Sequence, residues 1–292
     1  MSQRPVVVLD FDGTMTDAEA EGARFFPGYC TDLATLTGAP GAEVTALAES
    51  LLAEMFADPT RFAAEFGNPP RAVAPAVVDP YLRMTPIARR IYDHYKVIAD
   101  PGDRQRIGTL LYNHHYKATI EAPVFRPGAP ELLATLGTRD DLDVWVVTNS
   151  GTDHVREKIA RLDRSHGGVA WLGPRVRGNA GKFLIDDAWT SGPEDLAIPG
   201  LPRPILRRRR RYYDILAELC GGDFARLTVV GDIFELDLSL PAALGARVAL
   251  VRGPHTPAYE LAYLASLGAQ AAVVTDVAPV LDFIDLPRTT AA

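Results

Sequence analysis

Short apolar runs rich in Val and Leu recur along the chain, and they constrain its fold more than any other feature. Runs of this length without polar residues are typical of strands that are buried on both faces. Stretches with the apolar spacing of helices, such as Val155, Ile159 and Leu162, lie between and after them. Strands alternating with helices predict an α/β fold, in which helices cover both faces of a parallel sheet. The predicted strands are residues 5–9, 142–147, 227–230, 246–251 and 271–274.

The alternation stops after the first predicted strand, and the next hundred or so residues have the spacing of several helices. A helical insertion of this length predicts a second, smaller domain. We expect residues 1–17 and 124–292 to form the core and residues 18–123 to form a cap. The cap would cover the carboxyl edge of the sheet, where ligands bind in open α/β sheets. Its helices are expected at residues 42–56, 59–66, 86–95 and 103–116.

Three segments rich in Pro and Gly interrupt these patterns. Residues 68–70 and 123–130 are expected to connect the two domains, and a hinge could lie there. Residues 186–204 also carry several acidic side chains, and we expect a surface loop or a short flap.

The formal net charge of -7 limits the partners of this chain of 292 residues. A negative average field repels polyanions, so neither a nucleic acid nor an anionic membrane is expected as a partner. The basic run Arg207–Arg211 is too short to reverse this expectation. Only Cys30 and Cys220 are present, which indicates a reducing, cytoplasmic location. No apolar run reaches about 18 residues, so no membrane span is expected.

Two aspartates, Asp10 and Asp12, follow the first predicted strand and are closed by Gly13 and Thr14. Because alternate residues of an extended chain point to the same side, both carboxyl groups meet at the strand end, and Gly13 permits a sharp turn. Such a pair suits phosphoryl transfer. Asp10 would attack phosphorus to form an aspartyl-phosphate, and Asp12 would protonate the leaving oxygen and later deprotonate a water. Paired acids also cap helices or bind metals without chemistry, so these alternatives stay open.

Two further predicted strands also end in polar residues. Residues 142–147 run into Thr148 and Asn149, whose hydroxyl and backbone N–H groups suit a phosphate oxygen, although an ordinary helix cap is the alternative. Residues 227–230 run towards Asp232 and Asp237. Carboxylates there would supply the oxygen ligands that Mg2+ prefers, or would cap the following helix.

A cationic side chain is also required, because several carboxylates and a dianionic phosphate repel one another. Lys182 is the first candidate, since it follows a predicted strand at residues 169–176 and the small residues before it let the chain pass close to the site. The arginines at residues 207–210, just ahead of the helix before Asp232, are the alternative.

In this order the segments resemble the motifs of the haloacid dehalogenase-like (HAD) hydrolase superfamily, and the resemblance spans essentially the whole chain. In that family the third-motif residue lies shortly before the helix that leads to the fourth motif, whereas an irregular stretch separates Lys182 from that helix. Either an insertion follows Lys182, or an arginine near Arg208 has taken its role. The matching residues are Asp10, Asp12 and Thr14 for the first motif, Thr148 for the second, Lys182 for the third, and Asp232 with Asp237 for the fourth.

The resemblance implies a phosphatase-type hydrolase with a Rossmann-like, doubly wound core and a mainly helical cap inserted after the first motif. It implies Mg2+ as the cofactor, held by Asp10, the Asp12 carbonyl and Asp232. An acid at Asp12 favours phosphate esters over haloacids, because a halide leaves unprotonated. The predicted catalytic residues are Asp10, Asp12, Thr148 and Lys182, the predicted phosphate-binding residues Gly13, Thr14 and Asn149, and the predicted metal ligands Asp10, Asp12, Asp232 and Asp237.

Other functions remain open beside a phosphatase acting on a small phosphorylated metabolite. A phosphomutase would use the same residues, and a non-catalytic binding or regulatory protein would keep the fold as a scaffold. A histidine metal site in the predicted cap is disfavoured, because the neighbours His114 and His115 diverge on a helix. Residues 113–116 are instead expected to form a polar face of the cap or to contact the substrate.

Overall fold

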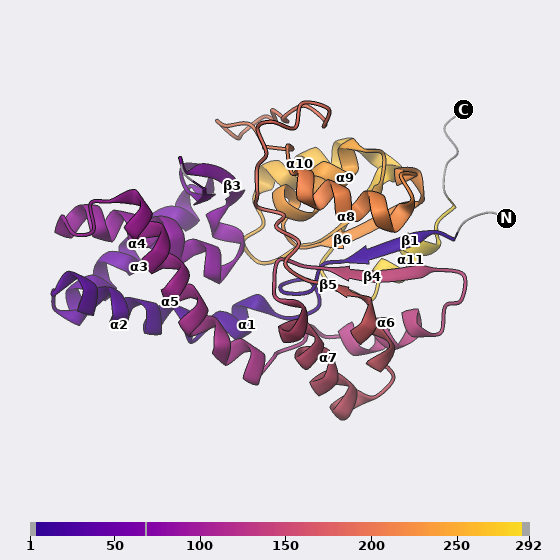
Figure 1. Ribbon diagram of the computed structural model, residues 1–292, viewed down its shortest axis with the longest axis horizontal. Helices are drawn as coiled ribbons and strands as arrows, with labels where there is room; N and C mark the ends of the chain where they lie inside the picture. The colour runs from indigo at the N-terminus through magenta and orange to yellow at the C-terminus, as the bar shows by residue number, and fades with distance from the viewer. Residues whose placement is uncertain (1–3, 68, 288–292) are drawn as a thin grey trace.

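The core is a six-stranded parallel sheet with the strand order β5-β4-β1-β6-β7-β8 (Figure 1). The computed structural model describes residues 4–67 and 69–287. Each of the five strands predicted from the short apolar runs is present, and the predicted α/β fold is confirmed. The strands are β1 (Val6–Leu9), β4 (Asp143–Val147), β5 (Val176–Arg177), β6 (Leu227–Gly231), β7 (Arg247–Val251) and β8 (Ala271–Val274).

Strand β1 lies between β4 and β6, with Leu9 paired in register to Val146 and Val230. Its side chains alternate between two apolar layers, because successive residues of a strand point to opposite faces. Val7 and Leu9 pack into one layer, and Val6 and Val8 into the other. The first layer is covered by α6 (Ala129–Gly137), α7 (Thr152–His166) and α11 (Val280–Asp285), the second by α8 (Arg210–Cys220), α9 (Ser239–Ala243) and α10 (Ala258–Ser266).

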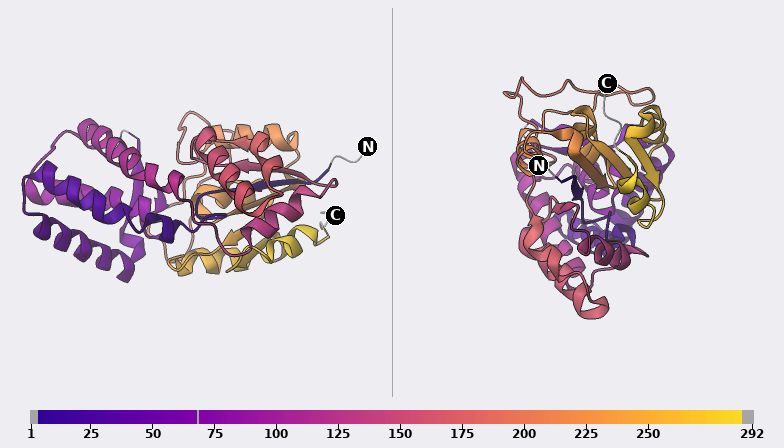
Figure 2. Two further views of the ribbon diagram at one scale, coloured as in Figure 1. Left: turned by 90° about the horizontal axis from the view of Figure 1, so that it is seen from below. Right: turned by 90° about the vertical axis from the view of Figure 1, so that its right-hand side faces the viewer.

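The insertion between β1 and α6 forms a separate body at one end of the core (Figures 1 and 2). Its helices pack around their own apolar centre, which includes Leu33, Met55 and Ile91. They are α1 (Ala18–Gly22), α2 (Phe25–Thr37), α3 (Gly41–Ala57), α4 (Pro80–Tyr95) and α5 (Pro101–Glu121), with short turns at Pro59–Arg61 and Ala76–Val78.

The cap also contains a β-hairpin formed by β2 (Ala63–Phe66) and β3 (Arg71–Pro75). The predicted helix at residues 59–66 was therefore wrong, because antiparallel pairing with a later segment outweighs a local spacing that also suits a helix. The predicted connection at residues 68–70 was also wrong: residues 69 and 70 lie in the hairpin turn, inside the cap, and Asn68 is outside the described residues.

The cap contacts the core on two sides of the carboxyl edge. On one side the ring of Phe66 lies 4.9 Å from that of Phe183, and Arg71 Nη1 donates to Asp187 Oδ1 at 2.7 Å. On the other side Phe56 stacks on His255 with ring centroids 4.3 Å apart. The cap is thus held over the ends of β1, β4 and β6.

The stretch between Lys182 and α8 is irregular, as predicted for residues 186–204. An antiparallel bridge pairs Leu196 with Ile205 inside this stretch, and the Asp186 N–H donates to the Arg208 carbonyl at 2.8 Å near its two ends. The predicted strand at residues 169–176 was wrong over most of its length. Residues Ala170–Arg175 form a 3-10 turn that contains Pro174, which lacks the N–H needed for a ladder, and only Val176–Arg177 pairs with β4. Of the helices that the structure describes, none is long and apolar enough to cross a membrane.

Candidate active site

The turn after β1 places the first pair of carboxylates. The Asp10 backbone N–H donates to the Val230 carbonyl at 2.8 Å, which holds the end of β1 against β6. Gly13 follows with φ of +85°, a conformation that other residues adopt at a cost. Its N–H donates to Thr16 Oγ1 at 3.2 Å, and Arg126 Nε donates to its carbonyl at 2.7 Å. The turn is therefore held on both sides.

Thr14 joins Asp10 to the end of β6. Its hydroxyl oxygen lies 3.1 Å from Asp10 Oδ2 and 3.0 Å from Asp232 Oδ1. The single hydroxyl hydrogen is therefore within hydrogen-bonding reach of both carboxylates. The Thr14 side chain is fully buried. It orients the two acids from strands that lie side by side in the sheet.

Lys182 supplies the cation next to Asp10. Its Nζ lies 2.7 Å from Asp10 Oδ1 and 2.7 Å from Asp237 Oδ1, and its side chain is buried. The Lys182 backbone N–H donates to Asn149 Oδ1 at 2.8 Å, so Asn149 positions the lysine loop.

The arginines considered as alternatives lie elsewhere. Arg208 pairs with Asp187 and with Asp195 on the irregular stretch. Arg209 is buried, but its guanidinium donates to the carbonyls of Lys182 and Val73 and so joins the lysine loop to the cap hairpin. Neither guanidinium is hydrogen-bonded to Asp10. The contact between Lys182 and Asp10 favours the alternative in which an insertion follows Lys182.

Asp237 lies on a π-helical turn, Phe234–Leu238, directly after β6. Its Oδ2 accepts the Ile233 backbone N–H at 3.0 Å, and its carbonyl accepts the Tyr212 hydroxyl at 2.9 Å. With Oδ1 bound to Lys182, both carboxylate oxygens of Asp237 have partners. The residue therefore holds the lysine in place.

Burial dominates the electrostatics of this group. It raises the pKa of Asp10 to about 7, against the lowering influence of Lys182. Burial, followed by the charges of Asp10 and Asp237, raises the pKa of Asp232 well above its ordinary value. Burial would lower the pKa of Lys182, but the carboxylates of Asp10 and Asp237 raise it. One ammonium does not balance this many buried acids, and further positive charge would stabilise them.

The donor set fits a divalent cation. One ligand oxygen from each of Asp10, Asp232 and Asp237 lies within 4.8 Å of the others, and all three residues are buried. Carboxylate oxygens are the ligands that Mg2+ prefers.

Asp12 has a different environment from Asp10. Lys158 Nζ donates to its Oδ1 at 2.7 Å, while Ser150 Oγ and the Tyr116 hydroxyl donate to its Oδ2 at 2.5 Å and 3.0 Å. Behind Lys158 lies the buried carboxylate of Glu21. Thr148 is buried beside this group, where its Oγ1 accepts the Ser150 N–H at 3.2 Å.

Sequence reasoning assigned no role to Lys158, Glu21 or Ser150. One signal was available for Lys158: it falls on the same helix face as Val155, Ile159 and Leu162, so its side chain had to point into the core. Glu21 and Ser150 had no comparable signal, because their partners are distant in sequence.

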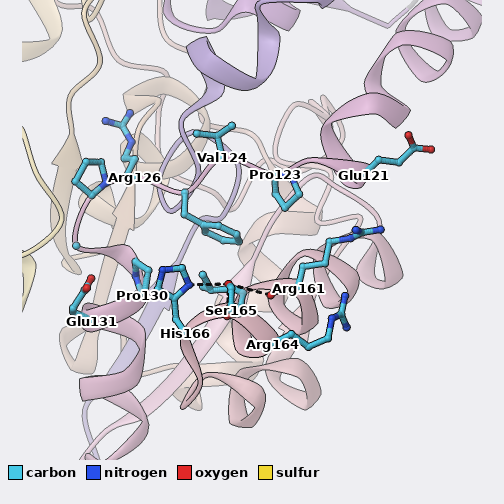
Figure 3. Close-up of a pocket in the computed structure, with 14 residues that line it drawn as sticks. Glu121, Pro123, Val124, Arg126, Pro130, Glu131, Arg161, Arg164, Ser165 and His166 are labelled. Atoms are coloured by element: carbon cyan, nitrogen blue, oxygen red, sulfur yellow. Dashed lines mark hydrogen bonds between the residues drawn. The ribbon is translucent and has the colours of Figure 1, made fainter.

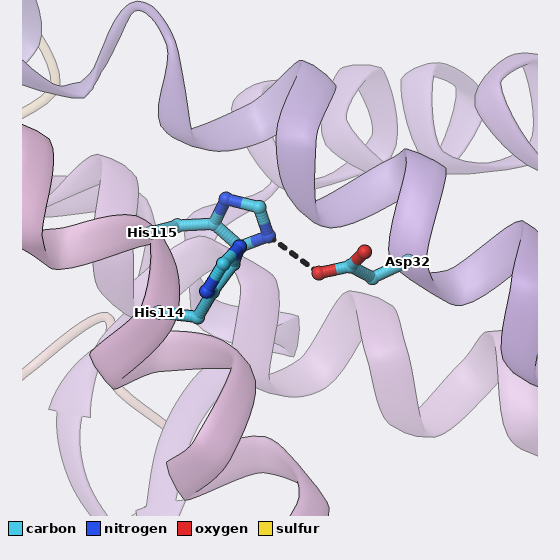
Figure 4. Close-up of side chains that lie close together, drawn as sticks. All are labelled: Asp32, His114 and His115. Atoms are coloured by element: carbon cyan, nitrogen blue, oxygen red, sulfur yellow. Dashed lines mark hydrogen bonds and ion pairs between the residues drawn. The ribbon is translucent and has the colours of Figure 1, made fainter.

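A second group of potential metal ligands, Asp32, His114 and His115, lies in the cap (Figure 4). His115 Nε2 is 2.7 Å from Asp32 Oδ2, and the two histidine rings are 4.8 Å apart. The expectation that the histidines diverge was wrong, because both side chains turn towards α2. The carboxylate–imidazole hydrogen bond accounts for the pair without a metal.

A hollow of about 710 Å3 lies where the segment returning from the cap passes the end of α7 (Figure 3). Its basic groups come from Arg126, Arg161, Arg164 and His166. None of the predicted catalytic residues lines it, although Arg126, which lines it, donates to the Gly13 carbonyl in the turn after β1.

No protein-family model matches the sequence, and no curated protein matches it either. The fold, by contrast, is similar to solved structures. A predicted phosphoglycolate phosphatase from Haemophilus somnus matches with a TM-score of 0.54 and 14% identity, over 97% of this chain and 98% of that chain.

Two other structures are similar over nearly the same extent. The HAD-like hydrolase SP0104 from Streptococcus pneumoniae has a TM-score of 0.53 at 12% identity, covering 98% of this chain and 100% of that one. YfnB from Bacillus subtilis, described as a HAD-hydrolase bound to magnesium, has a TM-score of 0.51 at 12% identity, covering 98% and 100%. The chain therefore has the fold of the HAD-like hydrolases, as its motifs predicted.

Proposed function

We propose that the chain is a Mg2+-dependent phosphatase that hydrolyses a small phosphorylated metabolite through an aspartyl-phosphate. The observation that carries the proposal is the position of Lys182 Nζ, 2.7 Å from Asp10 Oδ1 within a buried group of acids. A buried ammonium beside a carboxylate at a strand end orients a nucleophile and attracts a dianion. The HAD-hydrolase and phosphatase descriptions of the structural neighbours support the same class of reaction.

Asp10, the backbone carbonyl of Asp12, and Asp232 would hold Mg2+, with Asp237 beside them. When bound, Mg2+ supplies the positive charge that lets a phosphate dianion approach several carboxylates. The magnesium described for YfnB supports this assignment.

The residues divide the chemistry between them. A carboxylate oxygen of Asp10 attacks phosphorus, the ester P–O bond breaks, and Asp12 gives its proton to the leaving oxygen. Asp12 then takes a proton from water, whose oxygen attacks the phosphorus of the aspartyl-phosphate; Asp10 is restored and inorganic phosphate leaves. Thr148, Lys182 and the backbone N–H groups after β1 and β4 would hold the phosphoryl oxygens. The cap, docked on both sides of the site, excludes water.

Phosphate release from a panel of phosphorylated metabolites, with Mg2+ or with EDTA, tests the proposal. We expect Mg2+-dependent release of inorganic phosphate and none from Asp10→Asn. Formation of an isomeric phosphate ester instead of inorganic phosphate would identify a phosphomutase. Unchanged activity of Asp10→Asn would disprove the mechanism, and wild-type protein that binds the esters without turnover would indicate a binding protein.

A further inference from the structure

Lys158 is a fully buried lysine with two carboxylate partners. Its Nζ lies 2.7 Å from Asp12 Oδ1 and 3.1 Å from Glu21 Oε2, and the Lys158 and Glu21 side chains are both 0% exposed. Lysine is rarely buried without a specific partner, because removing the ammonium from water is costly. This arrangement therefore calls for an explanation beyond packing.

Glu21 fixes Lys158 to the two chain segments that join the cap to the core. Its Oε1 accepts the Val124 backbone N–H at 3.1 Å, and its Oε2 accepts the Thr16 hydroxyl at 3.3 Å. The same two segments bond directly to each other, since the Asp17 N–H donates to the Val124 carbonyl at 2.7 Å. Glu21 thus anchors Lys158 at the place where the two connecting segments lie side by side between cap and core.

Both carboxylate oxygens of Asp12 accept hydrogen bonds. Lys158 holds Oδ1 from the core helix α7, whereas Oδ2 accepts from Ser150 and from Tyr116 on the cap helix α5. A carboxyl group with donors on both oxygens has little freedom to rotate, and a proton donor must be aimed at its target to work.

We infer that Lys158 is a positioning residue: anchored by Glu21, it sets the orientation of the Asp12 carboxyl group for proton transfer to the leaving oxygen. The inference rests on the proposed function, in which Asp12 is the acid and base. Lys158 acts through Asp12 and does not contact the reacting phosphorus. A charge pair that serves only the stability of the hinge would hold Glu21 and leave Asp12 unaffected.

Two aryl esters separate these roles. p-Nitrophenolate leaves readily without a proton, whereas phenolate from phenyl phosphate depends more on the acid. We expect Lys158→Met to lower kcat/KM, which reports the step in which the leaving group departs, about tenfold more for phenyl phosphate than for p-nitrophenyl phosphate, within the range that general acids contribute. Asp12→Asn should show the same selectivity, and adding Lys158→Met to it should cost little more. The exposed Lys117→Met is the matched control.

Because Lys158→Met leaves Glu21 buried without its cation, Lys158→Met with Glu21→Gln is the second variant. Equal losses of kcat/KM for both esters, or losses of kcat/KM that are additive with those of Asp12→Asn, would overturn the inference. A crystal structure of the double variant decides it without activity: the Asp12 carboxyl group should leave its present orientation, and an unmoved Asp12 would refute the positioning role. If the wild type hydrolyses neither ester and none of the metabolites, the proposed function fails, while the crystal structure still reports on Asp12.

Discussion

Gly13 lies directly against the carboxylate of Asp232: a β-carbon at residue 13 would be 2.1 Å from Asp232 Oδ2. No side chain can occupy that position unless Asp232 moves. The contact joins the turn after β1 to the end of β6, and it gives residue 13 a second reason to be glycine, besides its backbone conformation.

Gly13→Ala should therefore abolish phosphate release and destabilise the fold by at least about 2 kcal/mol, from the left-handed backbone and the displaced acid together. Gly38→Ala is a matched control, because Gly38 also has a positive φ, of +68°, but a β-carbon there meets no described atom within 4 Å. Thermal unfolding and activity of both variants check this. Equal losses of stability would show that the contact with Asp232 is unimportant.

Lys182→Met should lower kcat at least about 100-fold, as expected when a cation that stabilises the transition state is removed. It also leaves Asp10 and Asp237 buried without their cation, which should cost about 3–5 kcal/mol of stability in EDTA. Mg2+ should recover part of that loss. Arg208→Met, at the alternative arginine, is the control and should cost no more than about 1 kcal/mol with activity retained. A larger loss of kcat in Arg208→Met than in Lys182→Met would assign the cationic role to Arg208 instead.

Tyr116→Phe should lower kcat several-fold while changing stability by no more than about 1.5 kcal/mol, since it removes one hydroxyl. The hydroxyl donates to Asp12 Oδ2 at 3.0 Å, and the ring should remain stacked on Tyr112, 5.3 Å away. Tyr112→Phe is the matched control. Steady-state kinetics with thermal unfolding distinguish the two, and a kcat equal to that of the wild type would mean that the cap does not hold Asp12 through this contact.

Glu260 predicts a pH dependence of stability. It is fully buried on α10, and neither carboxylate oxygen has a hydrogen-bond partner among the described residues. Burial, then the charge of Glu235, raises the pKa of Glu260 well above its ordinary value of 4.5. The folded protein thus keeps a proton that the unfolded chain has lost, so stability falls as pH rises above that value.

For one proton the unfolding free energy of the wild type changes by up to about 1.4 kcal/mol per pH unit, and Glu260→Gln should remove this change. The variant should therefore be more stable than the wild type at about pH 8. Urea unfolding between about pH 5 and about pH 8 measures the difference. Glu194→Gln, in the exposed part of the irregular stretch, is the control. Parallel curves for wild type and Glu260→Gln would show that Glu260 is ionised in the folded protein.

The sequence predicted the core well because its signals are local. An apolar run such as residues 271–274 is recognisable within itself, and the structure has β8 at the same residues. The cap was predicted less well. Residues 63–66 suit a helix by spacing, yet they pair with residues 71–75. One core segment was also mispredicted: the apolar residues of 169–176 suit a strand, yet most of that segment turns around Pro174.

For the site, the sequence by itself determined which acids could act, because Asp10, Asp12 and Asp232 each follow a strand that ends at the same edge of the sheet. Only the tertiary structure decided which cation meets them, since Lys182 reaches Asp10 through a loop that Asn149 and Arg209 hold from outside. The same is true of Lys158, Glu21 and Tyr116. Their roles depend on contacts between residues far apart in sequence, and the apposition of cap and core brings those residues together.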